Sequence, residues 1–229
     1  MADLKPFFEV AESEGGLFVG ARRNADADNY YWRITPWVMP CFTMVPPRGG
    51  DHPVHGHFFW IPIDDENCWA YSFDYHPVRP LTSHEVQAMK DGHGGVHSAN
   101  IPGTYRPQAN KDNDYLMDRA AQKRGDTYSG VRGGIAIQDS SLQESMGGPI
   151  ADRTKERLVS ADSGIIKARQ KLKRAAEALR DRGGMTPPGV DPEHHRVRSA
   201  AVVLSRDASF SEVCREDLKV REGVRQTSV

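Results

Sequence analysis

The sequence predicts an α+β fold, in which an antiparallel sheet is followed by one long helix. Two observations support this fold class. Residues 1–80 consist of short segments rich in aromatic and β-branched residues, separated by turns of glycine, proline and acidic residues. Residues 161–179 carry the strongest periodic signal in the chain, because apolar residues recur there at intervals of four and three. Consecutive strands joined by short turns are typical of an antiparallel meander.

The expected strands follow one another along the first third of the chain. They are residues 7–10, 17–22, 30–35, 41–45, 55–63 and 68–75. Residues 13–16 (Ser-Glu-Gly-Gly) predict a hairpin turn between the first two strands. Pro36 and Pro40 are expected to end the third strand, because proline lacks the N–H group that a strand ladder needs. A glycine-rich segment at 130–137 is expected as a further short strand that leads towards Asp139.

The long helix is expected to follow Ser160, which is a good N-cap residue, and to end at the glycine pair Gly183 and Gly184. Its apolar stripe is Ala161, Ile165, Ala168, Leu172, Ala175 and Leu179. Because alanine is frequent in this stripe, the helix can lie close to the sheet, which is the surface we expect it to cover. Shorter helices are expected at 83–90, capped by Thr82 or Ser83, at 113–123 and at 211–219.

The composition excludes several classes of protein. The chain has 229 residues, and its 30 lysines and arginines against 31 aspartates and glutamates give no general attraction to nucleic acid or anionic lipid. No apolar run approaches the roughly 18 residues of a membrane span, and no signal peptide is visible. The basic side chains at 167–182 favour a solvated helix face, since no nucleic-acid-binding module accompanies them. We therefore expect a soluble, cytoplasmic protein without nucleic-acid or membrane partners.

Two groups of histidines are candidate metal sites. The first group is His52, His55 and His57, and the second is Asp91, His93 and His97. His55 and His57 are two residues apart, so on a strand they would face the same side, as metal ligands must. A polar entry into the strand would give the same pattern. In the second group, the glycines at 92, 94 and 95 disfavour the helix that would align the ligands, which favours a loop.

A string of short motifs between residues 113 and 169 indicates a protein family more specifically than the composition of this segment does. In order, the motifs are 113–119 (Asn-Asp-Tyr-Leu-Met-Asp-Arg), 128–130 (Tyr-Ser-Gly), 138–139 (Gln-Asp), 143–147 (Gln-Glu-Ser-Met-Gly), 152–158 (Asp-Arg-Thr-Lys-Glu-Arg-Leu) and 160–162 (Ser-Ala-Asp). Upstream segments at 31–36 and 59–69 match in the same order. Over residues 30–179, the sequence resembles the C-terminal catalytic region of Rieske non-haem iron aromatic-ring-hydroxylating oxygenases, in the phthalate 4,5-dioxygenase-like branch.

This resemblance implies a helix-grip (START/Bet v 1-like) fold, in which a curved antiparallel sheet packs on a long C-terminal helix. It also implies a mononuclear Fe(II) held by two histidines and one carboxylate, with open positions for O₂ and substrate. Asp139 matches the carboxylate ligand, and no other catalytic or cofactor-binding residue is assigned. Alternatively, Asp139 is the N-cap residue of the segment that follows it. Trp32, Trp60 and Trp69 are expected in the core.

The chain departs from the family pattern in what it lacks. Full-length members begin with a Rieske domain, which is followed by the helix that supplies both iron histidines. Cys41, Cys68 and Cys214 are far apart, and none has a histidine two or three positions on, so this chain has no site for the cluster. The resemblance therefore places the two iron histidines outside this chain, and the [2Fe-2S] Rieske cluster in a missing N-terminal part or a partner chain.

The resulting prediction is the C-terminal part of a catalytic subunit that hydroxylates or demethylates an aromatic substrate with O₂, and that is inactive alone. Residues 1–183 would be the partial catalytic domain, and residues 184–229 a charged extension rich in proline and glycine. The implied partners are a Rieske-bearing polypeptide, a reductase and further copies in a trimer. A truncated product, a split subunit and a remnant all remain open. The alternative is a non-catalytic helix-grip module that binds an apolar or aromatic ligand.

Overall fold

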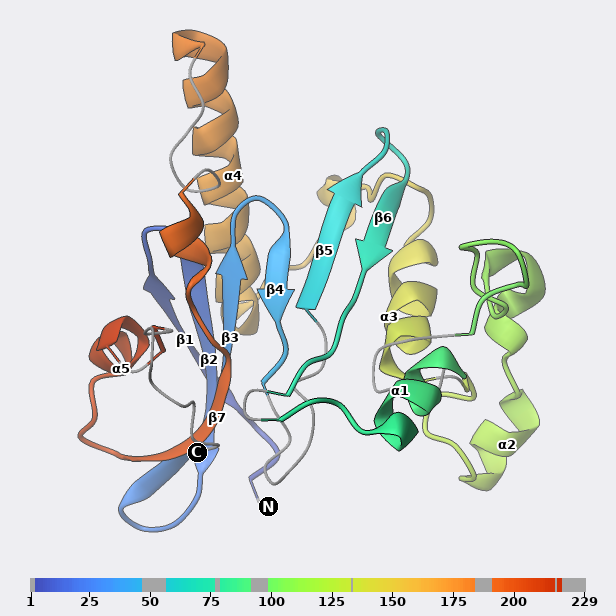
Figure 1. The fold of residues 1–229 in the computed structure, drawn as a ribbon, viewed down its shortest axis with the longest axis horizontal. Helices are drawn as coiled ribbons and strands as arrows, with labels where there is room; N and C mark the ends of the chain where they lie inside the picture. The colour runs from blue at the N-terminus through green and yellow to red at the C-terminus, as the bar shows by residue number, and fades with distance from the viewer. Residues whose placement is uncertain are drawn as a thin grey trace. The chain divides into compact units, whose positions relative to one another are not determined.

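The computed structural model describes residues 3–46, 57–76, 79–91, 99–132, 134–183, 191–216 and 218–219. The chain forms two compact units (Figure 1). Unit 1 comprises Met1–Ile61, Phe73–Arg79 and Arg157–Val229, and unit 2 comprises Pro62–Ser72 and Pro80–Glu156. Among the described residues, no helix is long and apolar enough to span a membrane.

Unit 1 is built on an antiparallel sheet. Its strands are β1 (Phe7–Glu12), β2 (Gly16–Asn24), β3 (Asn29–Val38), β4 (Phe42–Met44), β5 (His57–Pro62) and β7 (Ala200–Ser205). The strands β1 to β5 are neighbours in chain order, and β7 pairs with β3. The predicted antiparallel sheet and the α+β class are thus confirmed, and the apolar run after residue 200 forms an additional strand of the sheet.

The third strand continues through Pro36, where the sequence predicted its end. Pro36 lies opposite Phe18 of β2. β3 pairs with β7 over residues 29–34 and with β4 only at residues 37–38. Pro36 therefore lies between the two partners on that edge of β3, where a missing N–H group interrupts no ladder.

The long helix α4 (Ser163–Arg182) lies along β1 and β2 (Figure 1). Gly164 makes the close approach, because a Cβ atom there would lie 3.0 Å from a methyl carbon of Val19. Further along the helix, the Lys167 ammonium donates to the carbonyl oxygen of Val10 (3.4 Å), and Lys171 pairs with Glu12 (3.1 Å). A long C-terminal helix packed on an antiparallel sheet is consistent with the helix-grip fold.

The face of α4 that meets the sheet differs from the prediction. Ile165, Leu172 and Leu179 are 47%, 38% and 51% exposed. Contact through Gly164, Lys167 and Lys171 turns these apolar side chains away from the sheet, since adjacent helix positions lie about 100° apart. The helix also begins two residues later than predicted, because residues 160–162 form a 3₁₀ turn (η3, Ser160–Asp162).

The main core lies on the opposite face of the sheet, under α5 (Phe210–Glu216). Alternate residues of a strand face opposite sides, so Phe18 points away from the α4 side on which Val19 lies. The Trp32 ring stacks on Phe210 with centroids 4.7 Å apart. The buried cluster is Phe18, Trp32, Ile34, Ala200, Val202, Phe210, Cys214 and Leu218. The core position predicted for Trp32 is confirmed.

Before β7, Pro192–His195 forms a 3₁₀ turn (η5).

Unit 2 consists of short elements and long connections. They are β6 (Cys68–Tyr71), α1 (Ser83–Lys90), a 3₁₀ turn η1 (Lys111–Leu116), α2 (Arg119–Arg124), α3 (Ile135–Glu144) and a 3₁₀ turn η2 (Arg153–Lys155). Thr82 caps α1 in a capping box with Glu85, as one of the two predicted caps. The predicted helix at 113–123 is interrupted, because Asp114, Tyr115 and Leu116 have positive φ angles and cannot continue a right-handed helix.

Candidate functional site

Asp139 lies in the middle of α3, with one helical turn on either side of it. The predicted strand at 130–137 is wrong, because Ile135 already begins the helix after Gly134. Gly134 is the N-cap residue of α3, so the alternative role of Asp139 as an N-cap is also wrong. The side chain is exposed, yet partial burial raises the pKa of its carboxyl group above the usual value.

Apolar side chains surround this carboxylate along the helix. Ile135 and Leu142 are four residues before and three residues after Asp139, so all three share one face of α3. Ile135 is 45% exposed and Leu142 is 66% exposed, and Met146 in the turn after the helix is 62% exposed. Asp139 is therefore a carboxylate within an exposed apolar face, which accounts for the raised pKa.

The Asp139 carboxylate has no hydrogen bond or ion pair among the described residues. Other acidic side chains of unit 2 are engaged locally. Asp118 caps α2 through the Ala121 N–H, and Asp152 accepts from the Thr154 N–H. An unpaired carboxylate on an apolar face is available to a cation or a metal ion, which the capping carboxylates are not.

The raised pKa gives a prediction for stability. A carboxyl group whose pKa is higher in the folded chain than in the unfolded chain costs stability once pH rises through these pKa values. We expect Asp139→Asn to raise the urea midpoint of the isolated chain slightly at pH 7. The difference should shrink as the pH approaches about 4, where the carboxyl group is increasingly protonated. Urea titrations at several pH values measure this, and a lower midpoint for the variant at pH 7 would contradict it.

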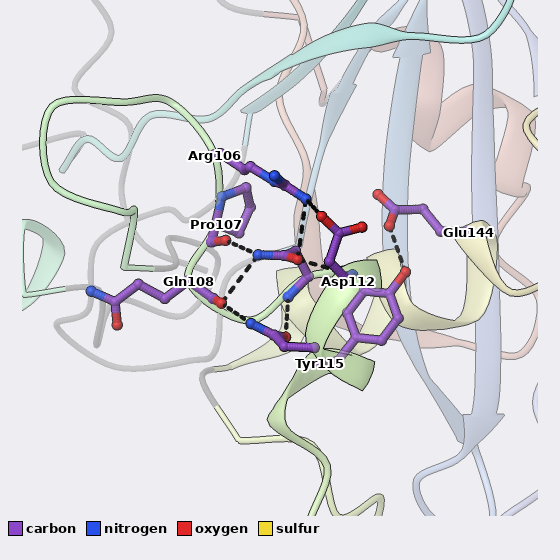
Figure 2. A network of polar contacts seen from close by, with 8 residues as sticks. Arg106, Pro107, Gln108, Asp112, Tyr115 and Glu144 are labelled. Carbon is purple, nitrogen blue, oxygen red and sulfur yellow. Dashed lines mark hydrogen bonds and ion pairs between the residues drawn. The ribbon is translucent and has the colours of Figure 1, made fainter.

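A second carboxylate of α3 has a structural role. The buried Tyr115 hydroxyl donates to Glu144 at the end of α3, with 2.5 Å between the oxygens (Figure 2). Burial and the acceptor carboxylate both raise the pKa of Tyr115, so the hydroxyl keeps its proton. Tyr115 also packs with Val131 and Ile137 in the small buried cluster of unit 2. The pair therefore ties the 3₁₀ turn to the helix that carries Asp139.

Polar contacts hold the loop that leads into this turn. The Asn110 side chain caps the turn by accepting from the Asp112 N–H, and its amide donates to the carbonyl oxygen of Pro107. Arg106 forms an ion pair with Asp112 (Figure 2). The Asn113 amide donates to the carbonyl oxygen of Gln108 at 2.7 Å. These contacts are local, and they fix the backbone that places Tyr115.

Removing the Tyr115 hydroxyl tests this link. We expect Tyr115→Phe to lower the free energy of unfolding by about 1–2 kcal/mol, because a hydrogen bond to a charged group is lost although Glu144 can be rehydrated. Tyr128→Phe is the matched control, because Tyr128 is 99% exposed and its hydroxyl can remain in water. Urea unfolding of both variants measures the difference. Equal stability of the two variants would show that the Tyr115 hydroxyl contributes nothing.

The described residues do not complete a metal site. They hold no group of three histidine, cysteine, aspartate or glutamate side chains that could bind a metal ion. His52, His55, His93 and His97 lie outside the described residues, as does the side chain of His57. Asp91 caps the end of α1 and accepts from the Gln87 amide. Among the described residues, Asp139 therefore belongs to no such group, and its role as an iron ligand stays a prediction.

Trp69 differs from the expected core position. It is 40% exposed on β6 and contacts Tyr105 edge-to-face, with centroids 5.3 Å apart. Trp60 on β5 is half-buried. The alternation of apolar residues around 59–69 predicts strands, but it does not determine how much of each tryptophan side chain other parts of the chain bury.

Comparison with known proteins identifies the family. The model of the family described as "LigXa C-terminal domain like" matches residues 2–214. The 3-chlorobenzoate-3,4-dioxygenase oxygenase subunit of Comamonas testosteroni is 29% identical over 199 residues, covering 83% of this chain and 45% of that protein. The phthalate 4,5-dioxygenase oxygenase subunit of Pseudomonas putida is 27% identical over 212 residues, covering 91% of this chain and 46% of that protein.

The chain thus spans about half the length of the curated relatives that it matches. Both relatives are oxygenase subunits of aromatic dioxygenases by name, which confirms the resemblance to the C-terminal region of ring-hydroxylating oxygenases. Since the family model covers nearly the whole sequence, the chain belongs to the LigXa C-terminal domain-like family.

Proposed function

We propose that this chain is the C-terminal part of the catalytic subunit of an oxygenase that oxidises an aromatic substrate with O₂. One observation carries the proposal. The Asp139 carboxylate is unpaired among the described residues and lies on an exposed apolar face of α3, at the position that the resemblance assigns to an iron ligand. Family membership and the two named relatives support the reaction class.

In this proposal, Asp139 supplies one carboxylate to a mononuclear Fe(II), and two imidazoles come from outside the described residues. Iron held by two histidines and a carboxylate would offer open positions for O₂ and substrate. Ile135 and Leu142 keep water away from the carboxylate once that face is covered. Tyr115 holds the end of α3 through Glu144 and so fixes the helix on which Asp139 lies.

The proposed partners follow from the same family. A Rieske-bearing polypeptide with its [2Fe-2S] cluster would deliver electrons from a reductase, because this chain has no cysteine and histidine pairs for a cluster. The names of both relatives refer to aromatic carboxylates, so we propose an aromatic carboxylate as substrate. The division at residue 183, a trimeric assembly and a cytoplasmic location stay predictions.

Product formation by the assembled components tests the proposed function. The chain is combined with the part of the Pseudomonas putida subunit that lies outside the matched region, together with a reductase. Phthalate or 3-chlorobenzoate is added in air, and oxidised products are measured by mass spectrometry. We expect product from the assembled pair and none from the chain alone or from a pair carrying Asp139→Asn. Equal product from the Asp139→Asn pair would contradict the proposed role of this residue.

A further inference from the structure

Helix α3 has two apolar faces, although a surface helix usually has one. Ile137 points into the small buried cluster with Tyr115 and Val131, and is 2% exposed. Ile135 and Leu142 lie on another face and remain 45% and 66% exposed. We define Ile135, Asp139, Leu142 and Met146 as the outer face of α3. Two apolar faces on one short helix are typical of a helix that is covered on both sides.

Further apolar side chains of unit 2 are exposed outside α3. Ile150, six residues beyond α3, is 65% exposed, and Leu116 beside the buried Tyr115 is 61% exposed. The described core of unit 2 is small by comparison, because its buried cluster consists of Tyr115, Val131 and Ile137. Exposed apolar side chains that gather on one face of a helix, beside a small core, are typical of a surface used for binding.

Charge decides between the candidate occupants. A second copy of α3 pairing with the first would bring the two unpaired Asp139 carboxylates towards each other in an apolar interface, which is unfavourable. An occupant must instead bring a cation or a bound metal ion to Asp139. More than half of each relative's length lies outside the matched region, and the family is described as a C-terminal domain. Such a subunit therefore contains a large segment that could cover this face.

We propose that the outer face of α3 is the docking surface for the segment of an oxygenase subunit that lies outside the region matched by this chain. The inference rests on the proposed function, because it takes that segment as the source of the remaining iron ligands. It goes further in naming Ile135, Leu142 and Met146 as the contacts that hold the two parts together. Docking through apolar contacts does not require iron, so the two parts should associate in the absence of metal.

The test measures association without metal. The full chain is titrated with the corresponding segment of the Pseudomonas putida subunit in a chelating buffer, and the Kd is determined by analytical ultracentrifugation. We expect Leu142→Glu combined with Met146→Glu to weaken association roughly 100-fold, as for two central interface residues. Leu172→Glu combined with Leu179→Glu is the matched control. These α4 positions of unit 1 are 38% and 51% exposed, and their change should alter the Kd less than about threefold.

Each outcome bears on the docking surface. No association of the unsubstituted chain, or equal weakening by the α3 and α4 pairs, would overturn it. Urea unfolding of both double variants checks that the chain still folds, which is expected because all four side chains are exposed. The chelator is then removed and Fe(II) is added, to separate the two proposals. Association without iron uptake would refute the role of Asp139 and leave the docking surface standing. Iron uptake together with undiminished association of the α3 variant would refute the docking surface and leave the role of Asp139 standing.

Discussion

Replacing Trp32 with alanine should lower the free energy of unfolding by about 3–5 kcal/mol, the range measured for large aromatic deletions in protein cores. Trp32 is 3% exposed, and its ring stacks on Phe210 of α5. The substitution removes the stacking contact between Trp32 and Phe210 and leaves a cavity beside Ile34 and Val202, which belong to the same cluster. Urea unfolding followed by circular dichroism measures the loss.

Trp69→Ala is the matched control for this effect. Trp69 is 40% exposed, and one of its ring contacts is with Tyr105, which is itself 80% exposed. We therefore expect Trp69→Ala to lower the free energy of unfolding by less than about half as much as Trp32→Ala does. A loss at Trp69 as large as that at Trp32 would contradict the assignment of the main core to the α5 side of the sheet.

The second large effect concerns iron. We expect Asp139→Ala to abolish the mononuclear iron of the assembled pair, because a site of two histidines and one carboxylate loses its only anionic ligand. Elemental analysis of the purified pair measures the iron. Asp207→Ala is the control, because Asp207 is an exposed aspartate of unit 1 that lies in the turn after β7. That control should keep its iron.

The same variant separates the oxygenase from the non-catalytic alternative. A helix-grip module that binds an apolar ligand without metal would retain its ligand affinity in Asp139→Ala, and would contain no iron before the substitution. Calorimetric titration with an aromatic carboxylate, performed with and without Fe(II), distinguishes the two. Iron that is retained in Asp139→Ala would mean that other residues hold it.

The strands of unit 1 could be predicted because their signals are local. Alternating apolar residues and the Ser-Glu-Gly-Gly turn specify β1 and β2 without reference to the rest of the chain. Pro36 led to a wrong prediction of the end of β3. Whether a strand can contain a proline depends on where its neighbours pair, here where β4 and β7 pair with β3, and strand pairing is a property of the folded chain. The periodicity of α4 likewise indicated a helix, but the close approach at Gly164 determines which face meets the sheet.

The site was predicted only in part, for a related reason. The iron-ligand role of Asp139 was inferred from the resemblance and stays a prediction, since no local pattern distinguishes a metal-binding carboxylate from any other. The Tyr115–Glu144 hydrogen bond joins residues 29 positions apart. It depends on a turn in which three consecutive non-glycine residues have positive φ angles, a conformation that the sequence does not indicate. Glu144 and Asp152 belong to the motifs that carry the resemblance, and in the structure Glu144 accepts the Tyr115 hydrogen bond while Asp152 caps a 3₁₀ turn.

The most direct test of the central claim is the iron content of the chain before and after it is combined with the Rieske-bearing polypeptide. Elemental analysis is performed on the chain alone, on the polypeptide alone and on the purified pair. Asp139 as one ligand of a shared site predicts little iron in the chain alone, and in the pair about one iron beyond the two irons of the cluster. A purified pair that contains only the cluster iron would contradict it.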